Sequence, residues 1–153
     1  MLNPQTAAEI YEEANLLLQT PEFRAQALME RMHVEVVCTT DDPVDDLAAH
    51  QAIRQSDCKV KVLPAWRPDR ILAIDKIKAF DSYLAQLEQA ADMTILSFKQ
   101  LIEALQKRHD YFAAHGCSLS DHGLDTFYTE EYTQQGVEVI FLKARMGKAL
   151  TEQ

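Results

Sequence analysis

The segment Lys61-Val-Leu-Pro-Ala-Trp-Arg-Pro-Asp69 decides the predicted fold, because an apolar run ends there in charged residues between prolines. Pro64 and Pro68 restrict the residues before them to extended backbone, so Arg67 is expected at a stiff strand exit. A short apolar run that ends in polar groups is typical of a buried strand that delivers side chains to one rim of a sheet. Arg67 is therefore expected to be presented at that rim.

Two further segments have the same pattern of an apolar run that ends in ionisable residues. They are Val34-Glu-Val-Val-Cys-Thr-Thr-Asp-Asp-Pro43 and Gly116-Cys-Ser-Leu-Ser-Asp-His-Gly123, and helix-like sequence follows each of them. We therefore predict an α/β fold with three parallel strands near residues 34–39, 60–65 and 117–120, adjacent in one sheet in chain order. Its chemistry is expected at the carboxyl ends of the strands.

Capping signals and helical periodicity predict the helices around these strands. Four segments are expected to begin helices: Thr6-Ala-Ala-Glu9, Thr20-Pro21, Asp42-Pro43 and Ser97-Phe-Lys-Gln100. In the second of these helices, Leu28 and Met32 are expected to point inward. A stripe of apolar residues at helical spacing predicts a helix that packs against the core. Its residues are Ile77, Phe80, Tyr83, Leu84 and Leu87. Residues 137–144 fit a strand or one face of a helix, and we favour the helix.

The composition fits one domain with a real core, since the chain has 153 residues of which 47% are hydrophobic. We expect leading helices over residues 1–32, three βα units over 33–128 and a helical tail over 129–153. A formal charge of −9 argues against non-specific binding to nucleic acid. No apolar run approaches the roughly 20 residues that span a bilayer, and the start lacks a basic signal-peptide region, so we expect a cytoplasmic location and no membrane contact.

The candidate site residues follow the predicted strands. Arg67 could hold a substrate carboxylate with two hydrogen bonds, or it could form a structural ion pair with Asp69 or a carboxylate on a neighbouring strand. Asp121 and His122 could supply a carboxylate and an imidazole, although a lone histidine is more often structural. Asp41 is expected to be free to orient a neighbour.

The cysteines and the other histidines do not indicate a metal site. Cys38, Cys58 and Cys117 are odd in number and lack C-x-x-C spacing, which disfavours both a disulfide framework and structural zinc, so buried free thiols are expected. The remaining histidines lack H-x-H and H-E-x-x-H spacing and are interpreted as structural or surface groups; they are His33, His50, His109 and His115.

Three motifs in this order resemble uronate isomerase, also called glucuronate isomerase. They are Thr39-Thr-Asp-Asp-Pro43, Val62-Leu-Pro-Ala-Trp-Arg-Pro-Asp69 and His115-Gly-Cys-Ser-Leu-Ser-Asp-His122. The resemblance implies a (β/α)8 TIM barrel of the amidohydrolase type that interconverts D-glucuronate with D-fructuronate and D-galacturonate with D-tagaturonate. It implies that Arg67 and Asp121 contact the substrate at the barrel mouth. We expect Asp41 and His122 to open toward the same rim and to complete the substrate-binding set.

The resemblance also implies that this chain is an internal segment of the enzyme. A complete barrel needs roughly 250 residues. The family's His-x-His pair, its later histidine, and the aspartate and arginine near its carboxyl end have no counterpart here. We therefore expect an inactive fragment without metal ligands, although the family implies a divalent metal, zinc, in the full-length enzyme. The alternative is a non-catalytic α/β module that binds an acidic small molecule or serves assembly. Open strand edges favour a homo-oligomer.

Overall fold

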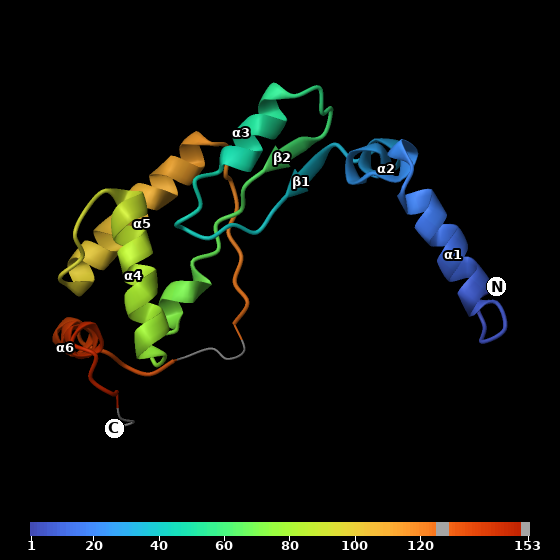
Figure 1. The fold of residues 1–153 in the computed structure, drawn as a ribbon. Coiled ribbons are helices and arrows are strands. Elements are labelled where there is room, and N and C mark those ends of the chain that lie inside the picture. The colour runs from blue at the N-terminus through green and yellow to red at the C-terminus, as the bar shows by residue number, and fades with distance from the viewer. Residues whose placement is uncertain (125–128, 151–153) are drawn as a thin grey trace. The chain divides into compact units, whose positions relative to one another are not determined.

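The computed structural model describes residues 1–124 and 129–150. The predicted boundary at residues 128 and 129 and the end of the predicted tail lie partly outside them. The elements are α1 (Ala7–Leu18), η1 (Pro21–Phe23), α2 (Ala25–Arg31), β1 (Val36–Cys38), α3 (Ala48–Gln55), β2 (Lys61–Leu63), η2 (Asp69–Leu72), α4 (Ile77–Ala91), α5 (Phe98–Ala114) and α6 (Gln134–Arg145). Figure 1 shows a mostly helical chain with a small sheet.

The chain divides into two compact units. Unit one comprises residues 1–37 and 49–62, and unit two comprises residues 38–48 and the described residues from 63 onward. In unit one, α1 has no buried residue, and its leucines at 16, 17 and 18 are exposed. The backbone N–H of Lys61 donates to the carbonyl of Glu35 over 3.0 Å. This bond belongs to the pairing of β1 with β2.

The parallel pairing continues in unit two beyond the ends of both strands. Thr39 N–H donates to Leu63 O, and Asp41 N–H donates to Ala65 O, each over 3.0 Å. A third segment joins at Ser120, which forms a parallel bridge with Trp66. The predicted order of three adjacent parallel segments is therefore confirmed, but the last of them forms a single bridge and no strand.

Helices α4, α5 and α6 pack on one another and hold the core of unit two. The predicted stripe is confirmed, because Phe80, Tyr83, Leu84 and Leu87 are buried. Helix α5 begins after Ser97, whose hydroxyl accepts a 3.2 Å hydrogen bond from the N–H of Gln100, as the capping signal predicts. The helix favoured for residues 137–144 is also confirmed, and its Phe141 and Ala144 are buried.

The helix predicted to begin at Asp42-Pro43 is wrong. Helix α3 begins only at Ala48. Leu47, the residue before it, has a φ of +55°, a left-handed backbone conformation that a regular right-handed helix does not contain. Asp45 and Asp46 each accept a hydrogen bond from a backbone N–H two residues ahead, over 2.6 and 2.9 Å. These local turns compete with a helix over the same residues.

Other local predictions also need correction. The hydroxyl of Thr6 donates to Met1 O over 2.9 Å and makes no cap bond, so that capping box does not form. The segment at Thr20-Pro21 makes only a short 3-10 turn before α2, and Met32 is 72% exposed where an inward side chain was expected. Cys38 is exposed and the other two cysteines are half-buried, so the thiols are free as predicted but not buried.

Candidate functional site

Trp66 sets the geometry of the candidate site. It forms parallel bridges with Asp41 on one side and with Ser120 on the other. Its ring is 9% exposed and packs edge-on against Phe112, with ring centroids 5.1 Å apart. Because the pairing is parallel, the residues that follow Trp66 and Ser120 leave the sheet together at one rim.

Arg67 and Asp121 are the first residues beyond the bridge, and they form a bidentate ion pair. Nε of Arg67 donates to Oδ1 of Asp121 over 3.1 Å, and Nη2 donates to Oδ2. The hydrogen bond that Arg67 donates to the Asp121 side chain is the largest influence on the pKa of Arg67 and raises it. The two side chains are 36% and 41% exposed, so this charge pair lies open to a ligand.

Asp69 lies two residues beyond Arg67. It contacts His122 and Gly123, the two residues that follow Asp121 on the neighbouring segment. Oδ1 of Asp69 lies 2.7 Å from Nδ1 of His122, and Oδ2 accepts the N–H of Gly123 over 2.6 Å. Partial burial opposes ionisation, but the hydrogen bonds from Gly123 and His122 outweigh it and lower the pKa of Asp69. Asp69 is therefore a carboxylate at neutral pH.

Asp41 does not open toward this rim, contrary to expectation. It is 8% exposed, and its Oδ2 accepts hydrogen bonds from the Thr39 hydroxyl over 2.6 Å and the Ala65 N–H over 3.1 Å. The buried carboxylate thus has hydrogen-bond partners and holds the backbone of Ala65, the residue before Trp66. The carboxylate does hold two neighbours, but the prediction that Asp41 would be free and open toward the rim is wrong.

Of the four predicted site residues, the structure brings Arg67, Asp121 and His122 together. From the sequence, Asp69 was considered only as an alternative partner of Arg67, and its contact with His122 was not predicted. The register offset explains why Asp69 meets this segment, because Arg67 to Asp121 and Asp69 to Gly123 are each 54 residues apart, and His122 lies between Asp121 and Gly123. That offset could have been read from the sequence only if the alignment of the two segments had been known.

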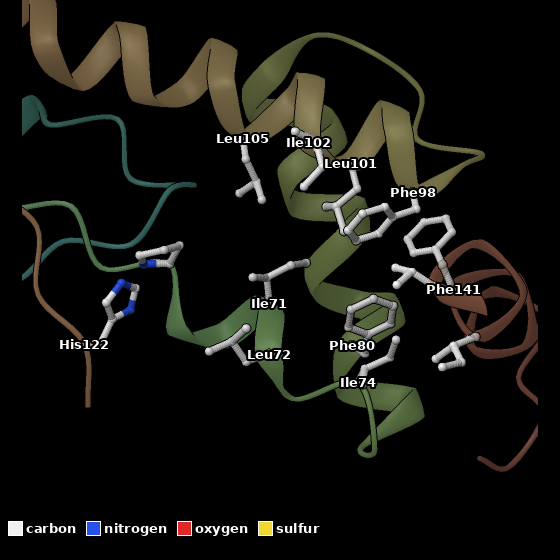
Figure 2. A pocket seen from close by; sticks show the side chains of 13 residues that line it. Ile71, Leu72, Ile74, Phe80, Phe98, Leu101, Ile102, Leu105, His122 and Phe141 are labelled. Atoms are coloured by element: carbon white, nitrogen blue, oxygen red, sulfur yellow. The ribbon is translucent and has the colours of Figure 1, made fainter. Parts of the chain in front are cut away.

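An apolar cavity of about 430 Å³ lies in unit two next to this rim. Figure 2 shows His122 at one end of the cavity and Phe141 at the other. Its wall is apolar apart from His122, and Pro68, Ile71 and Leu72 contribute the part that follows β2. The imidazole therefore lines an apolar surface and contacts Asp69 at the same time.

Within residues 1–124 and 129–150, no three histidine, cysteine or acidic side chains gather in a group that could hold a metal ion. None of the helices in this part of the chain is both long and apolar enough to cross a bilayer.

The fold and the site define an α/β protein that presents an arginine and carboxylates at the carboxyl ends of parallel segments. A sequence profile of glucuronate isomerase matches residues 1–153. The chain belongs to the glucuronate isomerase family.

Individual relatives agree with this assignment. The chain is 46% identical over 153 residues to the uronate isomerase of Bacteroides fragilis. The match covers 100% of this chain and 33% of that protein. It is 47% identical, with the same coverage, to the uronate isomerase of Phocaeicola vulgatus. The chain thus spans about a third of the length of these relatives.

Solved structures show the same fold. The crystal structure of uronate isomerase from Thermotoga maritima matches with a TM-score of 0.87 and 34% identity, over 99% of this chain and 33% of that one. The glucuronate isomerase of Caulobacter crescentus matches with a TM-score of 0.83 and 27% identity, over 96% of this chain and 30% of that one.

Proposed function

We propose that this chain is part of an aldose–ketose isomerase that acts on uronates. The substrates proposed are D-glucuronate and D-galacturonate, with D-fructuronate and D-tagaturonate as products. The observation that carries the proposal is the exposed Arg67–Asp121 pair at the carboxyl ends of parallel segments, in a chain that belongs to the glucuronate isomerase family. In TIM barrels this end of the strands is where active sites lie.

The arrangement suits a sugar acid. A uronate has a carboxylate at one end and hydroxyl groups along the chain, and a guanidinium binds a carboxylate through parallel N–H donors. Asp121 takes the hydrogen of Nε and one of Nη2, so the outer N–H groups of Arg67 are available for such a ligand. Asp121 keeps the guanidinium in place and tunes how strongly it attracts a second carboxylate.

The isomerisation moves a proton between C1 and C2 of an open-chain uronate through an enediol. That step needs a positioned base and stabilisation of the developing oxyanion. We assign Arg67 and Asp121 to binding the substrate at the barrel mouth. The described residues do not fit a divalent metal, because they bring no set of three ligands together. A zinc site, and the base, would therefore be supplied by other parts of a full-length enzyme.

The three parallel segments are proposed to be part of a (β/α)8 barrel of the amidohydrolase type. Relatives are about three times as long as this chain, and roughly 250 residues are needed to close a barrel. We therefore expect the 153-residue chain to be inactive by itself. The complete enzyme is proposed to work in the cytoplasm.

The proposal is tested by assaying the full-length reading frame on glucuronate and galacturonate. We expect turnover of at least one uronate, and a loss of kcat/KM of about tenfold or more in Arg67→Lys, because an ammonium cannot reproduce the planar fork. Arg24→Lys, at an exposed position in unit one, is the matched control and should leave kcat/KM unchanged. A wild-type enzyme that turns over neither uronate would favour the alternative, a non-catalytic module that binds an acidic small molecule.

A further inference from the structure

The contact between Asp69 and His122 is the feature of the rim that substrate binding by Arg67 does not explain. Both oxygens of Asp69 are used, one by Nδ1 of His122 at 2.7 Å and one by the N–H of Gly123 at 2.6 Å. The carboxylate thus holds the histidine through its side chain and the next residue through its backbone. A ring held in this way has a defined orientation, although it is 45% exposed.

The bonding also determines which nitrogen of the ring carries the proton. Asp69 is ionised at neutral pH, and an ionised carboxylate can only accept hydrogen bonds. Nδ1 of His122 must therefore be the donor. In the neutral imidazole Nε2 then has the lone pair and acts as a hydrogen-bond acceptor.

The carboxylate oxygens of this rim already accept hydrogen bonds from within the chain. Arg67 offers only donors, both oxygens of Asp121 receive hydrogen bonds from Arg67, and both oxygens of Asp69 are used as described. A sugar acid bound through its carboxylate brings hydroxyl protons that need acceptors. Nε2 of His122 is well suited to accept one, since the ring lines one end of the cavity (Figure 2).

We propose that Asp69 is a positioning residue, which holds His122 in the Nδ1–H tautomer so that Nε2 accepts a hydrogen bond from a hydroxyl group of the bound sugar acid. This inference rests on the proposed function for the identity of the ligand. The tautomer itself depends only on the contacts within the chain. The two parts can therefore be measured separately.

The variant Asp69→Asn separates a role in positioning from a role in folding. The amide oxygen can still accept the N–H of Gly123, while the amide nitrogen is a donor and must face a bare Nδ1. The proton of His122 should therefore move to Nε2, with little change in the backbone. If Asp69 only stabilised the fold, the change of tautomer of His122 in Asp69→Asn would have no effect on the binding of the ligand.

The first measurement is the tautomer of His122 in the 153-residue chain, read from the nitrogen chemical shifts of histidine-labelled protein at neutral pH. We expect Nδ1–H in the wild type and Nε2–H in Asp69→Asn. Asp110→Asn is the matched control, because Nδ1 of His109 lies 3.9 Å from Asp110, too far for a hydrogen bond, and its tautomer should not change. Nε2–H in the wild type, or the same tautomer in both proteins, overturns the inference.

The second measurement is kcat/KM of the full-length enzyme on glucuronate and galacturonate. Asp69→Asn should lower it about threefold to tenfold, the usual worth of one hydrogen bond. In a His122→Gln background the same change should have no further effect, because Asp69 acts through the ring. Asp110→Asn should have no effect in either background.

The outcomes distinguish this inference from the proposed function. Turnover of a uronate with unchanged kcat/KM in Asp69→Asn overturns the hydroxyl contact and leaves the proposed function standing. If neither uronate is turned over by the wild type, the proposed function and the hydroxyl contact both fail. An equal loss from Asp69→Asn in the wild-type and His122→Gln backgrounds also overturns the inference, because Asp69 would then act independently of His122.

Discussion

The hydroxyl of Tyr83, on α4, donates a 2.9 Å hydrogen bond to Oδ1 of Asp42, just beyond the end of β1. The same oxygen accepts the N–H of Val44 over 3.1 Å. The guanidinium of Arg70 lies over the Tyr83 ring, 4.6 Å from its centroid. A buried helix residue therefore fixes the turn that follows the first strand, at a position where the sequence predicted a helix cap.

This bond predicts a pH dependence. Burial and the Asp42 carboxylate raise the pKa of Tyr83 far above its usual range, so the folded protein keeps the hydroxyl protonated. The unfolded tyrosine loses its proton near pH 10. The stabilisation is therefore complete below about pH 10 and is lost as the pH rises further. Tyr83→Phe should cost about 1 kcal/mol at pH 7 and less at pH 10.5, as measured by urea unfolding. An equal cost at both pH values would contradict this account.

Arg108 is predicted to be the most sensitive charged residue of α5. It is 7% exposed and donates to the carbonyls of Pro43, Ala90 and Asp45 over 2.8, 3.1 and 2.7 Å. Burial lowers its pKa, and three carbonyls, of which that of Pro43 is in a buried contact and the other two are part-buried, would lose their donor on substitution. Arg108→Met should lower the free energy of unfolding by about 2–4 kcal/mol, measured by urea denaturation.

Lys99→Met is the matched control for that experiment, because Lys99 lies on the same helix and is 82% exposed, with Glu103 as its ion-pair partner at 3.6 Å. Its effect should stay within about 0.5 kcal/mol. Equal losses in the two variants would show that the loss reflects the charge and not the buried contacts.

Asp41 and Asp121 should respond differently to substitution. Asp41→Ala leaves the buried N–H of Ala65 without its acceptor and should cost about 1–3 kcal/mol of stability. Asp121→Ala removes a pair that is open to solvent, which contributes about 1 kcal/mol or less. The midpoints of thermal unfolding compare the two directly. A larger loss of stability in Asp121→Ala than in Asp41→Ala would show that the pair of Asp121 with Arg67 mainly stabilises the fold.

Self-association is expected of the 153-residue chain. In unit one, α1 exposes Leu16, which is 68% exposed, and in unit two Leu119 is 44% exposed. Burial of such side chains stabilises a complex by about 1.5–3 kcal/mol each, and a two-fold dimer buries one patch twice. Light scattering over a concentration series should give a mass that rises toward twice that of the chain. A constant monomeric mass at high concentration would refute the expectation.

Much of the fold could be predicted because it is encoded locally. The stripe of α4, the cap of α5 at Ser97 and the apolar runs before Arg67 and Asp121 are all short-range patterns that the structure reproduces. The failures are local signals that were overridden. After Asp42 the expected helix does not form, because the Asp45 side chain accepts the N–H of Leu47 in a local turn and Leu47 has a left-handed backbone.

The sequence by itself determined which residue types stand at the ends of the apolar segments, and so it named Arg67, Asp121 and His122. Only the tertiary structure decided how they pair. The parallel bridge of Trp66 with Ser120 places Arg67 against Asp121 and Asp69 against His122 and Gly123, and the bridge with Asp41 buries that carboxylate. Register is set by backbone hydrogen bonds between segments about fifty residues apart, and no local pattern encodes that alignment.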